Sequence, residues 1–298
     1  MKITSRNIDF IGKKNIFLLV SAVLFSLSLF FILSKGFQYG VDFRGGTIVQ
    51  IQFQEKVELQ PIRDLFDKQL KTSIQITTFG RDESNEILLS LPQGFLGGEG
   101  NKEEITERIP TILSEQYSNF EIRRVESIGP KVGEQLKQKA SYAVLYALFG
   151  ILLYIWLRFK FSYALGALVA LFHDVILTLG IFSMTEREIS LTVVAAILTI
   201  VGYSLNDTIV VFDRIRENRI RSSKKKWIEI INSSINQSLS RTLLTSLTTF
   251  FVVTALFILG GDIIHDFSFA LMVGVAIGTY SSIFVASPTL LHFQKTNS

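Results

Sequence analysis

The sequence predicts an α-helical integral membrane protein with six transmembrane helices and one extracytoplasmic α+β domain between the first and second helices. The chain has 298 residues, of which 48% are hydrophobic and 19% charged, and its mean hydropathy is +0.37. The apolar residues form long uninterrupted runs, and a run near twenty residues matches the hydrocarbon thickness of a bilayer. One long hydrophilic segment, residues 35–139, separates the first run from the others.

The first run, residues 15–34, follows Lys13 and Lys14. A secretory signal peptide also begins with basic residues, so the alternative interpretation is that this run is a signal peptide. The run is longer than the apolar core of a signal peptide, and no small-x-small cleavage site follows before Lys35. We therefore expect a retained first helix at 15–34, preceded by a short segment at 1–14.

The hydrophilic segment has the pattern of a small α+β domain. It predicts a strand at 46–53, a helix at 59–73, strands at 73–80 and 85–92 with a turn at 81–84, a flexible loop at 96–101, a helix at 102–117 interrupted at Pro110, and a last strand at 119–129. The order β-α-β-β-α-β is that of the ferredoxin-like motif. The segment shows no acid pair, nucleophile or phosphate-binding loop, so an interaction module is expected here rather than an enzyme domain.

Five further apolar runs follow the hydrophilic segment and make up the remainder of the membrane bundle at 140–291. They cover residues 140–157, 162–184, 189–212, 238–260 and 267–291. Six spans place the two ends of the chain, 1–14 and 292–298, on the same side of the membrane.

Lys and Arg residues predict the orientation, because cytoplasmic loops carry an excess of them. One set of short segments holds fourteen, and the short loops on the other side hold Arg187 alone. The fourteen are Lys2, Arg6, Lys13, Lys14, Arg158, Lys160, Arg214, Arg216, Arg219, Arg221, Lys224, Lys225, Lys226 and Lys295. Both termini are therefore expected in the cytoplasm, and residues 35–139 outside it.

The connection at 214–237 is strongly basic and also has an apolar face. Trp227, Ile228, Ile231 and Ile235 follow helical spacing beside three consecutive lysines. An interfacial helix on anionic lipid headgroups fits this pattern. A helix that docks on a partner subunit is the alternative.

Composition excludes several classes of function. The net charge of +4 could indicate nucleic-acid binding, but the basic residues cluster beside the spans, which favours contact with membrane lipids and not with nucleic acid. The chain has no Cys, and its three His residues show no ligand spacing. No metal, cofactor, catalytic triad or nucleotide-binding loop is predicted, and therefore no enzyme.

Acidic residues inside the apolar runs are the candidate functional groups. A charged side chain at mid-bilayer costs about 3 kcal/mol on insertion scales, so it faces the bundle interior or a wet cavity and has a partner. Asp207, beside Asn206, lies within the fourth run, and Arg241 begins the fifth. We expect Asp207 and Arg241 at similar depth, close enough for an ion pair. Asp174, beside His173, lies in the middle of the third run.

These acids have two readings. Asp207 is expected to change protonation state and carry an ion, with helix-joining polar contact as the alternative. For Asp174 the two readings remain equally open. Asp213 is expected as a surface charge at the end of its helix. The residues are compatible with either H⁺ or Na⁺.

Five stretches resemble the SecF family, whose members are the smaller subunits of the bacterial SecD–SecF pair that assists protein export. They are GVDFRGGT (40–47), IGPKVG (128–133), VGYSLNDTIVVFDRIREN (201–218), SSINQSLSRTLLTSLTT (233–249) and GTYSSIFVASP (278–288). The motif positions at the domain junctions are Asp42, Arg44, Gly45, Gly46, Gly129, Pro130 and Gly133. The resemblance places the chain near the resistance-nodulation-division transporters.

What the resemblance implies is a role in export through the bacterial cytoplasmic (inner) membrane, driven by the proton-motive force. It implies SecD, the SecYEG channel and the exported polypeptide as partners, with YajC and YidC as further candidates, and it places Asp207 and Arg241 on the proton path. A small-molecule exporter of the same superfamily and a non-transporting scaffold are the rival functions. A small-molecule exporter normally has both six-span halves and two external domains in one chain.

Overall fold

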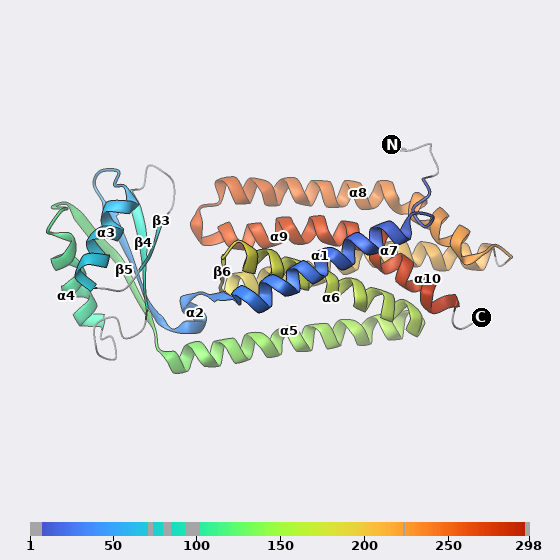
Figure 1. Ribbon diagram of the computed structural model, residues 1–298, viewed down its shortest axis with the longest axis horizontal. Coiled ribbons are helices and arrows are strands. Elements are labelled where there is room, and N and C mark those ends of the chain that lie inside the picture. Colours follow the sequence, from blue (N-terminus) through green and yellow to red (C-terminus); the bar gives the residue numbers. More distant parts are fainter. Residues whose placement is uncertain (1–7, 71–73, 80–84, 93–101, 223, 296–298) are drawn as a thin grey trace.

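The computed structural model describes residues 8–70, 74–79, 85–92, 102–222 and 224–295. These residues form a long helical bundle with a small α/β domain at one end (Figure 1). The start of α1 and the end of α10 lie at the other end of the bundle. The predicted turn at 81–84 and loop at 96–101 lie outside the described residues.

Each predicted apolar run forms a helix, and six helices in the described part of the chain are long and apolar enough to cross a membrane. Their lengths follow from the runs, because helices satisfy all backbone hydrogen bonds within a hydrocarbon phase. They are α1 (Lys14–Lys35), α5 (Pro130–Arg158), α6 (Phe161–Met184), α7 (Leu191–Arg221), α8 (Trp227–Leu259), and a last span made of α9 (Asp262–Ser281), the π-helix η1 (Ser282–Ala286) and α10 (Ser287–Lys295).

Three of these helices are longer than the apolar runs. The helix α5 begins at Pro130, where proline suits the first helical turn. At the far end of the bundle, α7 continues to Arg221 and α8 begins at Trp227, so both extend beyond the other helices (Figure 1).

The prediction of a separate interfacial helix in the connection 214–237 is therefore wrong, because its apolar residues belong to the beginning of α8. Trp227 and Ile228 lie in the first turn of α8, and Ile231 and Ile235 follow in the same helix. Ile231 and Ile235 are buried in one cluster with Ile215 of α7. Ile231 and Ile235 therefore pack within the bundle, whereas Ile228 is 40% exposed.

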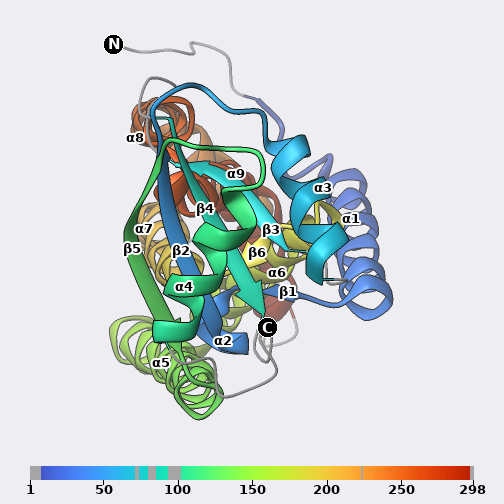
Figure 2. The ribbon, with the colours of Figure 1, turned by 90° about the vertical axis from the view of Figure 1, so that its left-hand side faces the viewer.

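The α/β domain has the predicted order of elements. They are β2 (Gly46–Phe53), α3 (Leu59–Leu70), β3 (Gln75–Phe79), β4 (Glu86–Pro92), α4 (Lys102–Leu113) and β5 (Phe120–Ile128). The strands form an antiparallel sheet in the order β3-β4-β2-β5. Alternate residues such as Ile51 and Leu89 face α3 and α4. Both helices cover the face of the sheet that points away from the bundle (Figure 2).

The predicted interruption at Pro110 is wrong, because α4 continues through it. Proline removes one backbone donor but leaves its own carbonyl, which accepts a hydrogen bond of 2.8 Å from the Ser114 N–H. One lost hydrogen bond near the end of the helix does not outweigh the burial of Ile109 and Leu113 against the sheet.

The junction between domain and bundle is built from the two glycine-bearing stretches. The short strands β1 (Gln38–Tyr39) and β6 (Glu188–Ile189) pair in parallel, and the one-turn helix α2 (Val41–Arg44) follows β1. Gly46 has φ +140°, and a Cβ there would lie 2.5 Å from the Leu91 carbonyl oxygen. A Cβ on Gly133 of α5 would lie 3.0 Å from the Phe43 carbonyl oxygen. Close backbone contacts therefore hold the domain on α5.

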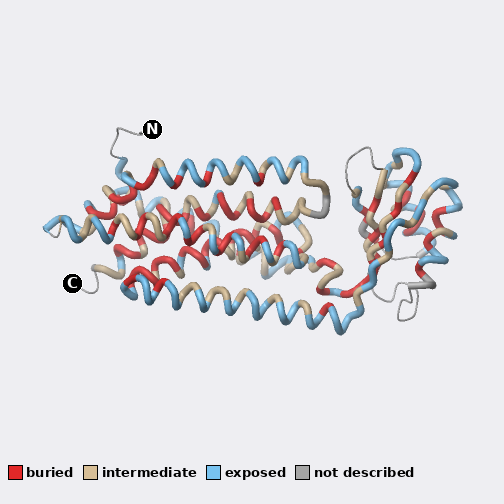
Figure 3. The backbone as a smooth tube through the Cα atoms, turned by 180° about the vertical axis from the view of Figure 1, so that it is seen from behind, coloured by how far each residue is buried: buried red, intermediate tan, exposed pale blue. Residues whose placement is uncertain are grey.

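The bundle is buried unequally. The helices α6, α7 and α9 form its interior, whereas α1, α5 and α8 expose most of their length (Figure 3). On α9, Gly274 and Gly278 contact Ile200 and Ser204 of α7, as small-xxx-small spacing predicts. This packing places Ser204 and Asp207 of α7 toward α6, α8 and α9.

Candidate functional site

Asp207 lies near the middle of α7 and is 1% exposed. Its Oδ2 accepts a hydrogen bond of 2.9 Å from the Ser246 hydroxyl of α8. The carboxylate is thus enclosed between two neighbouring helices and bound to a neutral group.

The expected ion pair between Asp207 and Arg241 is absent, although the structure describes both residues. Ser246 is the residue of α8 that lies opposite Asp207. Arg241 precedes Ser246 by five positions, which corresponds to about 7.5 Å along a helix. Its side chain is exposed on the outer face of the bundle. The residue of α8 that bonds Asp207 is therefore Ser246, which the sequence pattern did not identify.

Asn206 lies beside Asp207 in sequence but points outward. Further residues of α7 and α8 are also exposed within the apolar lengths of these helices. We call this set the outer polar face, and it consists of Thr199, Gly202, Asn206, Arg241, Thr245 and Thr248. Polar residues in membrane helices normally face a neighbouring helix or a wet cavity and not lipid. This face therefore lacks its packing partner in the single chain.

Asp174 forms a second buried polar site. It is 1% exposed, and each of its carboxylate oxygens has a partner. Oδ1 lies 2.9 Å from Nδ1 of His173, and Oδ2 accepts hydrogen bonds from the hydroxyls of Ser204 at 2.5 Å and Ser281 at 2.7 Å. The site joins α6, α7 and α9.

The two acids are linked through α7. Ser204, the partner of Asp174, precedes Asp207 by three residues, a rise of about 4.5 Å. Ser204 faces α6 and α9, whereas Asp207 faces α8. The structure does not bring the two carboxylates into direct contact; because residues three apart are neighbours on a helix surface, they lie beside adjacent parts of one side of α7.

Asp213 is a half-exposed charge, as expected, but it lies within α7 and not at its end, because the helix continues to Arg221. Its Oδ1 lies 3.3 Å from Nη2 of Arg158, and both side chains are about two-fifths exposed, at 43% and 42%. This surface ion pair joins α7 to the end of α5.

The motif residues at the junction position the outer end of the bundle. Asp42 Oδ2 accepts a hydrogen bond of 2.9 Å from the Leu191 N–H, and Arg44 donates one of 2.7 Å to Gln38 Oε1. Gly45 has φ +74°. Gly129 caps α5 in an extended conformation, followed by Pro130 at the first helical position. Sequence reasoning identified these residues as a junction but not the contact of Asp42 with α7.

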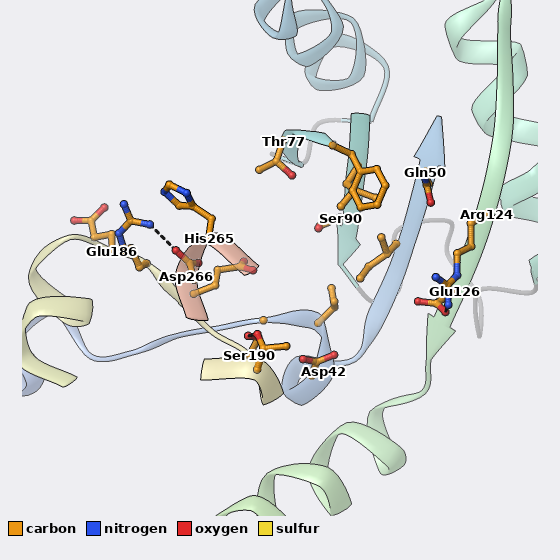
Figure 4. Close-up of a pocket in the computed structure, with 18 residues that line it drawn as sticks. Asp42, Gln50, Thr77, Ser90, Arg124, Glu126, Glu186, Ser190, His265 and Asp266 are labelled. Atoms are coloured by element: carbon orange, nitrogen blue, oxygen red, sulfur yellow. Dashed lines mark hydrogen bonds and ion pairs between the residues drawn. The ribbon is translucent and has the colours of Figure 1, made fainter. Parts of the chain in front are cut away.

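A cavity of about 590 Å³ lies between the open face of the sheet and the outer end of the bundle (Figure 4). The sheet contributes Gln50, Thr77 and Ser90, and the bundle contributes Glu186, Glu188 and Asp266. Sequence reasoning missed this cavity, because it forms only where the domain faces the bundle.

The charges at this cavity are partly paired. Glu186 binds Lys35 at 2.6 Å, and Asp266 binds Arg187 at 2.5 Å. Burial raises the pKa of Glu188 above its usual range; Arg44 opposes the shift, and the carboxylates of Asp266 and Asp42 add to it. In the described part of the chain, no group of three His, Asp or Glu residues is placed to hold a metal ion.

Comparison with known proteins gives two family matches. The profile of "Protein export membrane protein SecD/SecF, C-terminal" matches residues 108–296. That of the "SecD/SecF GG Motif" matches residues 30–57, which include the first junction stretch. Together the two matches cover both junctions and all the buried acids described above.

Individual relatives agree with these matches. A protein of Calditerrivibrio nitroreducens named "Protein translocase subunit SecF" is 46% identical over 94% of this chain and 92% of its own length. A relative of the same name from Haemophilus influenzae is 44% identical over 93% of this chain and 83% of its own length. The crystal structure of SecDF, a translocon-associated membrane protein from Thermus thermophilus, superposes with a TM-score of 0.85 at 34% identity. It covers 99% of this chain, which spans 40% of that longer chain.

Proposed function

This chain belongs to the SecD/SecF family of protein-export membrane proteins, and we propose that it couples an ion gradient across the bacterial cytoplasmic membrane to late steps of polypeptide translocation. It is a multi-pass membrane subunit of the SecF type in Sec protein export, and not an enzyme.

The observation that carries the proposal is the environment of Asp207. The carboxylate is buried within a membrane span, and its partner is the neutral hydroxyl of Ser246 and not a fixed cation. A hydroxyl donates to a carboxylate and accepts from a carboxylic acid equally well. Both protonation states of Asp207 therefore keep a hydrogen bond, which suits a group that binds and releases a proton.

The membrane potential supplies enough free energy to use such a site. One elementary charge gains about 2.3 kcal/mol per 100 mV. Since about 1.4 kcal/mol corresponds to a factor of ten, each proton shifts a two-state equilibrium about fifty-fold. Protonation of Asp207 removes a buried charge between α7 and α8, and the packing of these helices changes in response.

The junction offers a route from α7 to the domain. Ser190 caps the outer end of α7, and Asp42 binds the Leu191 N–H. The pairing of β1 with β6 attaches the same point to the chain entering the domain. A displacement of α7 is thereby transmitted to the domain, which would hold or release the emerging polypeptide.

SecD is the proposed partner on the outer polar face. The similar Thermus structure is named SecDF, and this chain corresponds to two-fifths of it. A second six-helix half packed on Thr199, Gly202 and Asn206 would cover the exposed polar groups of α7. Arg241 would then lie at the interface, where a conformational change brings it to Asp207 or to an acid of the partner. The SecYEG channel, YajC and YidC are proposed as further partners.

The topology follows from the charge distribution and the shape of the bundle. Both termini, 1–14 and 292–298, are proposed to lie in the cytoplasm. The domain at 35–139 is proposed to be ferredoxin-like and extracytoplasmic, with 15–34 and 140–291 forming the membrane bundle. The strand order β3-β4-β2-β5 and the location of α1 and α10 at the far end support this assignment.

Reconstituted export tests the function. Proteoliposomes that contain this chain, SecD and SecYEG are prepared with a polypeptide stalled midway through the channel. Completion of its translocation is then measured with an imposed proton gradient, with a sodium gradient and with no gradient. A coupled subunit predicts completion that depends on one of the gradients and on this chain. If the chain stimulated translocation equally under all three conditions, the non-transporting scaffold would be the remaining function.

A further inference from the structure

We propose that His173 and Asp174 form a second proton-binding site, separate from Asp207, in which Nε2 of His173 takes up and releases one proton. The binding chemistry stands on the geometry of these two residues alone. Its use in export rests on the proposed function.

Asp174 is held as a carboxylate by three donors. The hydroxyls of Ser204 and Ser281 donate to Oδ2, and the His173 ring nitrogen Nδ1 lies 2.9 Å from Oδ1. An ionised carboxylate accepts hydrogen bonds at both oxygens, so these partners match its charged form. With Asp174 ionised, Nδ1 of His173 carries the proton that is donated to Oδ1.

The remaining nitrogen of His173 has no partner. The His173 side chain is 6% exposed, and Nε2 is buried without a hydrogen bond in the part of the chain that the structure describes. With Nδ1 protonated, Nε2 carries a lone pair and is the free basic atom of the site. A water bound at Nε2 would donate to the lone pair, and after protonation the same water would accept from the N–H.

Charge balance favours proton uptake at this atom. A neutral His173 beside an ionised Asp174 gives the pair a net charge of −1 in the middle of a membrane span. A proton from water that binds Nε2 converts the ring to imidazolium and brings the pair to zero. A net buried charge is costly in hydrocarbon. Neutralising the net charge of the pair therefore offsets the free-energy cost of ionising the imidazole ring.

The groups around the pair do not replace this role. On α9, the Tyr280 ring stacks on His173 at 6.4 Å, but its hydroxyl bonds Ser21 Oγ and the Phe17 carbonyl. On α7, the titratable groups nearest Ser204 are Tyr203 and Asp207. The charged side chains of α1, α5, α9 and α10 lie toward the ends of these helices.

The site lies where a charge change has structural consequences. Ser281 is the last residue of α9, and the π-helix η1 begins at the next residue. π-Helical turns are rare and often occur at functional sites. Gly278 packs against Ser204, so α9 and α7 approach closely here. A change in the charge of Asp174 and His173 therefore acts on the joint of α6, α7 and η1.

A proton fits the site better than a sodium ion. A bound cation needs oxygen lone pairs directed at one point. Here both serine hydroxyls and the imidazole N–H are directed at the carboxylate as donors, and the free atom is a nitrogen. The competing interpretation is a fixed polar contact that joins three helices and never titrates.

Nitrogen-15 NMR of histidine in the full chain, embedded in lipid bilayers, tests the proposal. The chain has three His residues, so the double variant His265→Gln/His292→Gln leaves His173 as the one labelled ring. The expected result is that the Nε2 shift moves reversibly from its neutral to its protonated position as the pH is lowered. A His173 signal that stays in one protonation state from pH 4.5 to pH 9 would overturn the proposal.

Two further variants in this single-His background separate the interpretations. Asp174→Asn removes the negative partner and should change the pH dependence of the His173 signal. Asp207→Asn should leave a titration of His173 in place, so failure of the proposed Asp207 function and failure of this site are distinguishable. Replacing potassium by sodium at constant ionic strength should change nothing; a sodium-dependent shift would overturn the assignment to protons.

Discussion

The carboxylate of Asp42 accepts a hydrogen bond of 2.9 Å from the backbone N–H of Leu191, the first residue of α7. Asp42 lies on α2, directly before the first strand of the α/β domain, whereas α7 carries Asp207 at its middle. The first turn of a helix has N–H groups without intrahelical acceptors, and carboxylates stabilise this end. One hydrogen bond thus connects the domain to the helix that holds the candidate ion site.

Asp42→Ala should loosen this connection. The lost acceptor is expected to cost about 1 kcal/mol, as for other residues that cap helix ends, and to raise amide hydrogen exchange at Leu191 about five-fold. Asp42→Asn is the matched control, because its amide oxygen can still accept the bond. Exchange is followed by mass spectrometry of the membrane-embedded chain. Equal protection in the alanine and asparagine variants would show that Asp42 does not hold α7.

Gly46→Ala should destabilise the junction by about 2 kcal/mol or more. Its φ of +140° is unfavourable for a side chain, and the Cβ would lie 2.5 Å from the backbone oxygen of Leu91. Gly129→Ala is the control, since nothing lies within 4 Å of a Cβ there. Thermal unfolding in detergent should distinguish them. A Gly46→Ala protein with the unfolding temperature of Gly129→Ala would contradict the packing described.

Glu188→Gln should change how stability depends on pH. Burial raises the pKa of Glu188 above its ordinary value of 4.5, so the folded junction binds a proton more readily than the unfolded chain. The contribution of Glu188 is therefore most favourable at low pH and decreases as the pH rises from about 4.5 through the raised pKa. The variant lacks this decrease, and its unfolding temperature relative to the native chain should rise between pH 4.5 and pH 7.

Glu186→Gln is the control of opposite sign. The hydrogen bond and charge of Lys35 lower the pKa of this exposed carboxyl. The contribution of Glu186 to stability is present above the ordinary pKa of this carboxyl and decreases as the pH falls. It is small because the ion pair is exposed. If both variants showed the same pH profile, the burial of Glu188 would not be the cause.

Gly202 tests the outer polar face. A Cβ on Gly202 meets nothing within 4 Å, and the same holds for Gly150 of α5. Gly202→Leu should therefore leave the isolated chain as stable as Gly150→Leu. If SecD packs on α7, the leucine at 202 should abolish co-purification with SecD, whereas the one at 150 should not. Retention of SecD by the Gly202→Leu chain would place the partner on another face.

The sequence predicts the elements better than their contacts. Strict alternation predicts β2 at its observed bounds, 46–53, and run length predicts six membrane helices. Helix ends were less predictable, because α5, α7 and α8 continue through polar residues that do not break a helix. No local sequence signal indicates that these three helices extend beyond their apolar runs.

The site depends on helix register, which local pattern does not contain. The packing of Gly274 and Gly278 on α7, together with the neighbouring α8, sets which residues meet. The partner of Asp207 is therefore Ser246 and not Arg241. The two serine partners of Asp174 lie 30 and 107 residues further along the chain. Burial of an acid predicts that partners exist, but only the assembled bundle identifies them.

Asp207→Asn is the decisive variant for coupling. Asparagine has nearly the shape of aspartic acid and keeps an acceptor for the Ser246 hydroxyl, so insertion and pairing with SecD should persist. It cannot release a proton, so polypeptide completion in proteoliposomes should no longer respond to the gradient. Ser246→Ala should keep a response to the gradient but change its pH dependence, since it removes the hydroxyl that bonds the Asp207 carboxyl. Ser238→Ala is the control, because that buried hydroxyl donates within its own helix. A gradient response of native size in Asp207→Asn would mean that the ion passes elsewhere, and Asp207 would then serve only to join α7 to α8.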